Sequence, residues 1–237
     1  MEPHADTAAF ERVLVVVAHP DDVEYGMAGT VARWVEEGKT VSYVLVTRGE
    51  AGNEDAALTA EQAGALRERE QRAAAAAVGV TDLRFLGWPD DAVYYGPDLR
   101  RAIAREIRRV RPEVVATDQG TLFWGGRVVN HADHRATTEA TIDAILDASL
   151  RHAFPELLAE GFEPWRRVKR LYLCGDPEAD VAVDVTATLP KAIAALQAHA
   201  SYVGDMDCAA YLRDQTAQNG VLWGIPHAEL FRVIRYA

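Results

Sequence analysis

Residues 13–30 read VLVVVAHPDDVEYGMAGT, and this stretch sets the organisation of the whole chain. Its first five residues, Val13–Val17, are apolar and mostly β-branched, without polar alternation. Such a run is typical of a strand buried on both faces, as in a parallel sheet. Pro20 lacks a backbone N–H and biases His19 away from helical angles, so we expect the strand to end there. A helical spacing of apolar residues follows at Met27, Val31, Trp34 and Val35.

The turn between this strand and this helix carries His19, Asp21 and Asp22. Open α/β sheets bind ligands at the carboxyl ends of their strands, so these side chains mark a candidate site. A purely structural interpretation exists, because Asp at such a turn is often a helix N-cap and a single His is often packed or exposed. Two adjacent Asp residues and a His around a proline are more polar than capping requires. We therefore favour a functional cluster.

The alternation of strand and helix continues along the chain. We expect further strands at residues 41–47, 83–86, 114–117, 171–173, 181–183 and 230–234. Helices are expected at residues 58–78, 99–110, 188–200 and 206–218, and in a segment that ends near residue 149. This order predicts an α/β, Rossmann-like fold with a mostly parallel sheet, helices on both faces and a metal site at the carboxyl ends of the strands. No repeat or linker interrupts it, so residues 1–237 are expected to form one domain, with a loose tail at 1–10.

The composition supports a folded domain and argues against several kinds of partner. Hydrophobic residues make up 49% of the chain, which is ample for a core. The net charge of -11 argues against nucleic acid, whose phosphates require Lys and Arg, and against anionic lipid. Cys174 and Cys208 lie outside any metal-binding spacing, which fits core positions in a reducing compartment. The start, MEPHADTAAF, is unlike a signal peptide, and no apolar run has the length of a membrane span. We therefore expect a cytoplasmic protein without membrane insertion.

A second polar cluster follows residues 118–130, which contain three glycines and show no clear period. It reads Asn130-His131-Ala132-Asp133-His134-Arg135 and opens the helix that ends near residue 149. His131 and His134 are three residues apart, so one helical turn places both imidazoles on the same face. A purely structural alternative is that Asp133 serves as the N-cap of this helix and has no other role. The cluster follows a buried strand, at the edge of the sheet where the strands have their carboxyl ends and ligands are expected. We therefore favour a site shared with the first cluster.

Together the two clusters supply imidazoles and carboxylates from two segments of one rim. Two His and one Asp, with a position left for water and no cysteine, are typical of a catalytic zinc site. Imidazole suits zinc, iron or nickel, whereas magnesium prefers oxygen ligands, so a magnesium phosphotransfer site is disfavoured. A further carboxylate is available to take a proton from water, and a further His to meet the oxyanion or the leaving amine. This inventory matches hydrolysis of an amide or an ester.

The sequence resembles the PIG-L/LmbE-like family of zinc-dependent N-acetylglucosaminyl deacetylases, which includes enzymes of mycothiol and bacillithiol synthesis. The two clusters carry the resemblance, as His19-Pro20-Asp21-Asp22-Val23-Glu24 and His131-Ala132-Asp133-His134-Arg135. Shorter motifs extend it over nearly the whole chain: Thr47 to Gly52, Arg67 with Glu70, Gly87 to Asp90, Ala198 to Ser201, and Ala228 to Arg232. Two positions depart from the family's commonest pattern, because Val23 stands in place of Glu and Ala132 in place of Pro.

The resemblance implies a metal set and a base. It assigns Zn²⁺, one ion per chain, or another divalent transition metal, to His19, Asp22 and His134. It assigns the role of general base to Asp21, which then is not a ligand.

The resemblance also implies roles for the surrounding residues. His131 polarises the reacting carbonyl or protonates the amine, and Asp133 orients it. Arg67 and Asp90 contact substrate hydroxyls, with Asp91 as the alternative to Asp90. Spacing alone allows a blander interpretation of Arg67, as one half of a solvated pair with the carboxylate three residues further on.

The expected function is removal of the N-acetyl group from an N-acetylglucosamine-type sugar conjugate, with release of acetate and a free amine. The expected partner is that small amino-sugar conjugate, with no nucleic acid and with homo-oligomerisation left open. One alternative is an amidase that cleaves a larger acyl group from a thiol-sugar conjugate. Another is a catalytically idle sugar-binding module. We expect the loops at residues 49–59 and 120–130 to select the group attached to the sugar.

Overall fold

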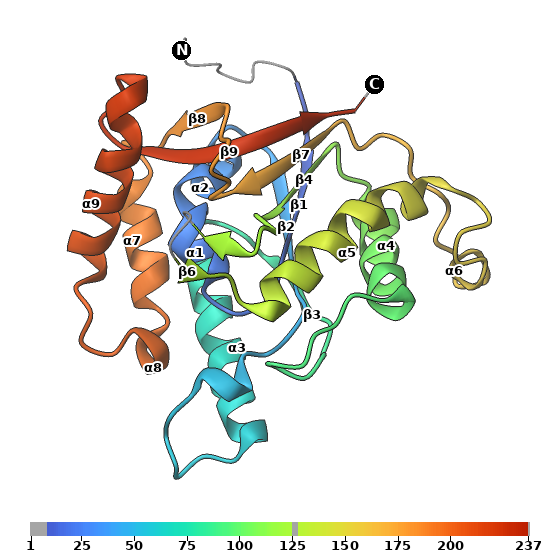
Figure 1. Ribbon diagram of the computed structural model, residues 1–237, viewed down its shortest axis with the longest axis horizontal. Helices are drawn as coiled ribbons and strands as arrows, with labels where there is room; N and C mark the ends of the chain where they lie inside the picture. The colour runs from blue at the N-terminus through green and yellow to red at the C-terminus, as the bar shows by residue number, and fades with distance from the viewer. Residues whose placement is uncertain (1–8, 125–127, 237) are drawn as a thin grey trace.

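The structure is a computed structural model that describes residues 9–124 and 128–236. Most of the tail expected at residues 1–10 lies outside the described residues, as does part of the loop at 120–130. Within the described residues, seven strands form one sheet in the order β3-β2-β1-β4-β7-β9-β8 (Figure 1). Their bounds are β1 Arg12–Val17, β2 Thr40–Leu45, β3 Asp82–Phe85, β4 Val114–Asp118, β7 Arg170–Cys174, β8 Val181–Asp184 and β9 Ala228–Arg235. A separate hairpin pairs β5 (Phe123–Trp124) with β6 (Val128–Val129).

The sheet is parallel over most of its width. Strands β3, β2, β1, β4 and β7 run in one direction, and β9 runs antiparallel between β7 and β8. In the central strands Val15 pairs with Tyr43 on one side and with Ala116 on the other. The chain moves outward from β1 to β3 and then returns to place β4 on the opposite side of β1. The carboxyl ends of β1 and β4 therefore form a topological switch point, where α/β sheets bind ligands.

Helices cover both faces of the sheet, as the sequence predicts. One face carries α1 (Asp22–Gly26), α2 (Ala28–Glu36), α3 (Ala60–Ala77), α7 (Leu189–Gln197) and α9 (Cys208–Gly220). The other face carries α4 (Pro97–Val110) and α5 (Ala132–Ser149). Shorter turns of helix are η1 (Glu50–Gly52), α6 (Glu156–Ala159), α8 (Ala200–Val203) and η2 (Val221–Trp223). The parallel strands are thus buried on both sides, which is why β1 has no polar alternation.

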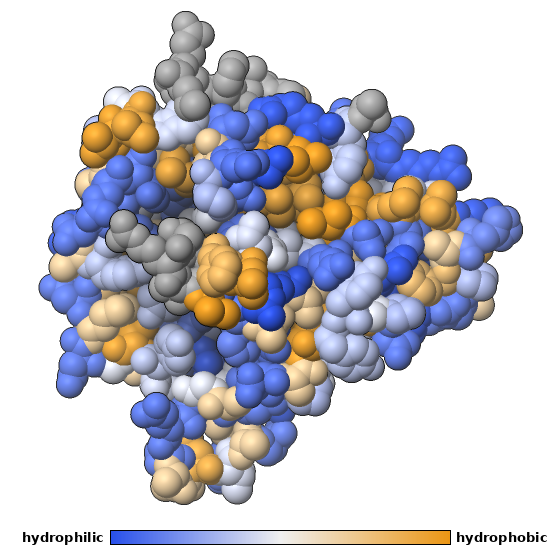
Figure 2. All heavy atoms as spheres, viewed as in Figure 1, coloured by the Kyte–Doolittle hydropathy of each residue, from blue (hydrophilic) through white to orange (hydrophobic). Residues whose placement is uncertain are grey.

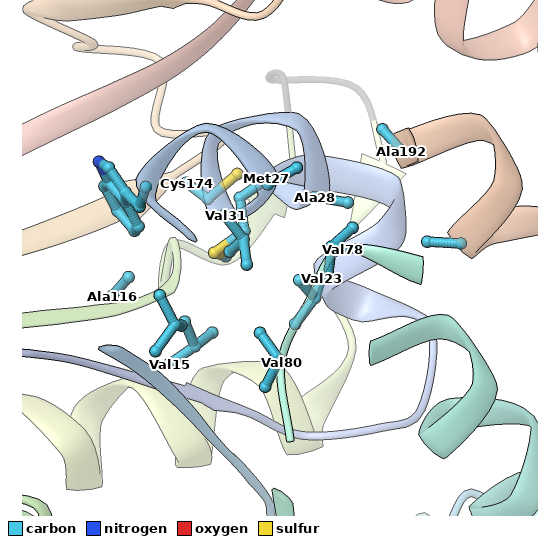
Figure 3. Packing of buried hydrophobic residues seen from close by; sticks show 14 of the residues in the cluster. Val15, Val23, Met27, Ala28, Val31, Val78, Val80, Ala116, Cys174 and Ala192 are labelled. Carbon is cyan, nitrogen blue, oxygen red and sulfur yellow. The ribbon is translucent and has the colours of Figure 1, made fainter. Parts of the chain in front are cut away.

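Alternate residues of β1 enter the two halves of the core. Val15 belongs to the cluster that contains Met27 and Val31, and Leu14 belongs to the cluster that contains Ile103. Figure 3 shows Met27 and Val31 beside the strand residue Val15. Both free cysteines are buried, as the sequence predicts.

The segment after Pro20 differs from the single helix that the apolar spacing predicts. It forms two helices, because Met27 adopts φ -146° and ψ 11° and separates α1 from α2. The first N–H groups of a helix lack partners within it. Here the carboxylate of Glu229 accepts the N–H groups of Gly29 and Thr30, at 2.9 and 2.7 Å. Glu229, two hundred positions away in the sequence, thus caps α2. This contact gives the Ala228 to Arg232 motif a structural role.

Figure 2 shows that hydrophilic residues cover much of the face it displays, with hydrophobic residues gathered in several patches among them. Among the described residues, no helix combines the length and the apolar character that crossing a membrane requires.

Candidate metal centre and active site

The predicted site residues meet at the carboxyl ends of β1 and β4. They line a cavity of about 730 Å³, whose lining includes His19, Asp21, Asp22, Arg67, Asp90, His131 and His134. His19, Asp21 and Asp22 come from the turn after β1, and His131 and His134 come from the start of α5. Asp133 is fully buried at the edge of this cluster. The two sequence clusters therefore form one site.

Three candidate ligand atoms form a small triangle. His19 Nδ1 lies 3.0 Å from His134 Nε2, which lies 3.2 Å from Asp22 Oδ1. The other carboxylate oxygen of Asp22 is 3.7 Å from His19 Nδ1 and accepts the His19 backbone N–H at 2.8 Å. Ligand atoms of a tetrahedral zinc ion with bonds of about 2.0–2.1 Å are about 3.3 Å apart. Two sides of the triangle, at 3.0 and 3.2 Å, thus match the edges of such a tetrahedron, and the set fits zinc.

The second nitrogen of each ligand histidine has a fixed partner. His134 Nδ1 lies 3.1 Å from Asn130 Oδ1, and His19 Nε2 lies 3.1 Å from Asp90 Oδ1. His19 Nε2 is also 3.3 Å from Asp133 Oδ2. Because these oxygens are acceptors, each contacting nitrogen is assigned the proton and the opposite nitrogen keeps its lone pair for the metal. Such contacts orient metal-binding imidazoles and increase their basicity.

The electrostatics of the cluster favour a bound cation. Burial opposes a positive charge on His19, but hydrogen bonds with nearby carboxylates, Asp133 first, raise the pKa of its imidazole to about 12. Burial likewise opposes charge on His134, but the carboxylate of Asp22 raises its pKa to about 9. The carboxylates therefore hold protons on the imidazoles in the metal-free site. A divalent cation can replace those protons and satisfy the same negative charge.

Asp21 is built into the site differently from Asp22. It precedes α1 in the left-handed region, with φ 89°, and its side chain makes no capping hydrogen bond. Its N–H donates to Gln71 Oε1 at 2.9 Å, and Arg67 Nη2 donates to its Oδ2 at 2.8 Å. Few residues other than glycine adopt this conformation without support from their surroundings. Gln71 and Arg67 thus hold a buried carboxylate beside the ligand triangle, where a base is expected.

Replacing Gln71 by Leu is expected to destabilise the protein and slow turnover while leaving metal content unchanged. Gln71 is fully buried, and its Nε2 also donates to Glu24 Oε1 at 3.0 Å. The substitution leaves the Asp21 N–H and the Glu24 carboxylate without this partner, at a cost of about 1–3 kcal/mol for each buried group. Thermal unfolding, metal analysis and kcat measure the three effects. The exposed Gln218 supplies the control, since Gln218→Leu should change none of them. Normal kcat in Gln71→Leu would show that Asp21 does not need this support.

The surroundings of His131 differ from the expectation in one contact. His131 is the N-cap of α5, and its Nδ1 accepts the backbone N–H of Asp133 at 3.3 Å. The carboxylate that reaches its Nε2, at 3.3 Å, belongs to Asp91. The Asp133 carboxylate instead contacts His19 and accepts the N–H groups of Asp91 and Val93. Asp133 therefore orients His131 through its backbone, because its side chain is turned toward the metal ligand.

The two predicted substrate contacts are engaged with the protein. Arg67 is buried and donates to the carbonyls of Pro20 and Gly49 as well as to Asp21. The solvated pair with Glu70 does not form, since Glu70 accepts the backbone N–H and the hydroxyl of Ser201, at 2.8 and 2.6 Å. Contact with substrate stays a prediction for Arg67.

Asp90 and Asp91 face different histidines. The carboxylate of Asp90 contacts His19 and accepts the N–H of Ala51 at 2.8 Å. The more exposed Asp91 reaches His131. Substrate contact by Asp90, or by Asp91 in its place, stays a prediction.

Sequence reasoning named Asn130 in the second polar cluster without giving it a role, and it missed Asp118 and Gln71. Asn130 precedes His134 by four residues, a helical spacing that could have suggested its contact with the ring. Asp118 ends β4 on the ligand rim and lines the cavity, so its position after a buried strand was a usable signal. Burial and the charge of Asp22 raise the pKa of Asp118 to about 7. Gln71 lies in the middle of α3, and only the tertiary fold brings it to Asp21.

Fold and site together define an α/β protein with a candidate His-Asp-His metal site at the switch point of its sheet. A family profile described as GlcNAc-PI de-N-acetylase, PIG-L, matches residues 14–145. The match covers more than half of the chain and includes both polar clusters. The chain therefore belongs to the PIG-L family.

Three proteins similar to this chain are, by name, deacetylases of acetylated amino sugars. A probable N-acetyl-α-D-glucosaminyl L-malate deacetylase 2 of Bacillus anthracis is 32% identical over 195 residues, 80% of either chain. A 1D-myo-inositol 2-acetamido-2-deoxy-α-D-glucopyranoside deacetylase of Kineococcus radiotolerans is 30% identical, over 94% of this chain and 77% of the relative. Among solved structures, the N,N'-diacetylchitobiose deacetylase of Pyrococcus horikoshii has a TM-score of 0.88 at 25% identity, covering 95% of this chain and 84% of its own.

Proposed function

We propose that the protein is a zinc-dependent hydrolase that removes the N-acetyl group from an N-acetylglucosamine-type sugar conjugate. The observation that carries the proposal is a buried carboxylate, Asp21, held beside a triangle of ligand atoms from His19, Asp22 and His134. Zinc bound in that triangle supplies a Lewis acid for the acetamide carbonyl and lowers the pKa of water to about 7. The named activities of the relatives supply the substrate class.

In the proposed reaction, water adds to the carbonyl carbon of the acetamide and the bond from that carbon to nitrogen breaks. Asp21 accepts the proton that the attacking water loses, because its carboxylate is the one held beside the triangle by Arg67. The leaving nitrogen receives a proton and departs as a free amine, and the acyl group departs as acetate. His131 lies on the cavity wall 5.1 Å, ring centre to ring centre, from His19. This position supports the proposal that its Nε2 donates a hydrogen bond to the carbonyl oxygen or a proton to the amine.

Replacing His131 by Ala is expected to retain the metal and reduce kcat by about 10²–10³-fold. The alkaline limb of the pH–rate profile should also disappear, because the proton donor is then missing. His131→Gln separates the two roles, since an amide can donate a hydrogen bond but cannot transfer a proton. Metal analysis and pH–rate profiles of both variants measure these effects. Metal loss in His131→Ala would make His131 a ligand, and an unchanged alkaline limb would assign the proton donor to another group.

Replacing Arg67 by Met is expected to move the acid limb of kcat/KM upward by about 1–3 pH units. Burial and the Asp22 charge raise the pKa of Asp21 to about 7, and Arg67 opposes this rise. A base must be ionised, so activity is present above its pKa and is lost as pH falls through it. Removing the cation raises this pKa further. Arg67→Lys keeps the charge and should show a smaller shift in the same profile. If the acid limb lies at the same pH in Arg67→Met and in the unmodified protein, the base that titrates is not Asp21.

Two alternatives use the same site. An amidase for a larger acyl group needs the same metal set, so only acyl-chain length in the substrate separates it from a deacetylase. An idle sugar-binding module has no need of the carboxylate of Asp21 beside the metal ligands, and the presence of Asp21 counts against it. The test is acetate and amine release across a panel of N-acetylglucosaminyl conjugates with zinc supplied, alongside matched longer acyl amides. Acetate release supports the proposal. Release of only the longer acids favours the amidase, and release of no acid favours the binding module.

A further inference from the structure

We propose that the cavity contains a second subsite, for a neutral polyhydroxylated group attached to the acetylated sugar. The subsite is the wall formed by Tyr25, Tyr211, Gln215 and Asn219, here called the tyrosine–amide wall. The proposal rests on the proposed function in one respect, because it takes the reacting sugar to lie at the metal ligands. It assigns to α1 and α9 a selectivity that the sequence assigned to the loops at residues 49–59 and 120–130.

The cavity extends well beyond the metal ligands. Its lining runs from His131 and His134 at the start of α5 to three residues of α9. Both segments line the same cavity, and Figure 1 shows α9 and α5 as separate helices. Its volume of about 730 Å³ lies in the upper part of the range of about 300–1,000 Å³ that holds drug-sized ligands. There is room for a second ring beside the one that carries the acetamide.

Helix α9 presents two different stripes. Cys208, Leu212 and Thr216 are buried and anchor the helix in the core. Tyr211, Gln215 and Asn219 follow the same four-residue spacing, so they share a neighbouring face, and all three line the cavity. An aromatic residue and two amides at successive turns of a well-anchored helix make a rigid wall. Tyr25 of α1 completes it, with its ring 5.6 Å from that of Tyr211 at an interplanar angle of 85°.

The groups on this wall match hydroxyl groups. Phenol and carboxamide side chains both donate and accept hydrogen bonds, as sugar and cyclitol hydroxyls do. Asn219 Nδ2 donates to the Ala228 carbonyl at 3.2 Å, which fixes the amide, and Gln215 Nε2 lies 3.5 Å from the Tyr211 hydroxyl. Burial raises the pKa of Tyr25 and of Tyr211, so both phenols stay neutral at physiological pH. Aromatic surface with a few placed polar groups is typical of small-molecule sites.

The charge of the cavity disfavours an anionic group at this subsite. Asp90, Asp91, Asp118 and Asp176 also line the cavity. Among the described residues of the lining, Arg67 is the one Lys or Arg, and it is bonded to Asp21 and to two backbone carbonyls. A carboxylate on the ligand would therefore find no free Lys or Arg among the described residues of the lining. A sugar or cyclitol fits this field better than a dicarboxylic acid such as malate.

The test measures equilibrium binding to zinc-loaded Asp21→Asn protein, which the proposed function expects to bind without turnover. Calorimetric titrations compare N-acetylglucosamine with its conjugates to inositol and to malate. We expect the inositol conjugate to bind about tenfold more tightly than the monosaccharide, and the malate conjugate to show no such gain. Tyr211→Ala and Gln215→Ala should each weaken the inositol conjugate by about tenfold and leave the monosaccharide unchanged. Gln218→Ala, on the exposed side of the same helix, is the control and should change neither.

The proposal is overturned if the malate conjugate binds more tightly than the inositol conjugate, or if no ligand binds. Equal weakening of the monosaccharide and the conjugate in the α9 variants also overturns it, because the effect is then structural. Acetate release by the unmodified protein reports separately on the proposed function. The expected binding pattern without acetate release would leave the subsite standing and reject the deacetylase. Acetate release without the binding pattern would do the reverse.

Discussion

Asp21→Asn is expected to keep its metal and to release acetate about 10²–10⁴-fold more slowly than the unmodified protein. The substitution preserves the size of the side chain and its hydrogen bond to Arg67, which lies at 2.8 Å. It removes the proton acceptor beside the ligand triangle. Metal analysis of the purified variant and kcat for an N-acetylglucosaminyl conjugate measure the two expectations independently.

Asp22→Asn supplies the matched comparison, because the two residues are adjacent and the substitution is chemically the same. Asp22 Oδ1 is 3.2 Å from the ligand nitrogen of His134, so its neutral amide should hold the metal poorly. We therefore expect Asp21→Asn to retain the metal and Asp22→Asn to lose it. Near-normal turnover in Asp21→Asn would remove Asp21 from the role of base.

His19→Ala and His134→Ala are expected to lose bound metal and activity together. Each substitution removes one corner of the triangle, and loss of even an outer hydrogen-bond partner costs about 10–100-fold in metal affinity. We expect affinity to fall by more than about 100-fold for each variant, measured by competition with a chelator. His152→Ala, at an exposed position outside the site, is the control and should keep both metal and turnover. Full occupancy of either ligand variant would make the assigned triangle wrong.

The same two histidines make the metal affinity depend on pH. In the metal-free site the pKa of His19 is raised to about 12 and that of His134 to about 9. Zinc needs both nitrogens unprotonated, so it displaces protons at neutral pH, and its affinity falls as pH falls. The ligand variants should show a weaker dependence, because each has lost one of the displaced protons.

The fold class could be predicted from β1 and the alternation that follows it. Continuous apolar runs such as Val13–Val17 recur where the structure places buried strands, and their order suffices for a mostly parallel sheet with helices on both faces. Periodicity could not predict the antiparallel position of β9, because strand direction depends on where the chain returns. It also could not predict the break at Met27, since the carboxylate that caps α2 comes from Glu229.

The candidate site was predictable where residues adjacent in sequence act together. The two polar clusters meet because both follow strands that end on the same rim. Sequence spacing could not predict contacts between distant segments, such as Asp91 with His131 and Gln71 with Asp21. The departure from the family pattern at Val23 also depends on the fold, because the Val23 side chain packs in the core and the Glu24 side chain is buried.

The partner of Glu24 explains another C-terminal motif. Its Oε2 lies 3.3 Å from Nε2 of the buried His199, and its Oε1 accepts Gln71 Nε2. A chain of buried contacts therefore links the Ala198 to Ser201 motif to the residue that holds Asp21. Sequence similarity flagged this motif without a role, and the structure gives it one in positioning.

The most direct test of the central claim is the rate of acetate release from an N-acetylglucosaminyl conjugate as zinc is added to metal-free protein. Binding of one ion by His19, Asp22 and His134, one of two candidate groups that share His19, predicts a negligible rate without metal. The rate should then rise in proportion to added zinc and level off at about one equivalent per chain. A full rate in chelator-treated protein, or no acetate at one equivalent of bound zinc, would contradict the account.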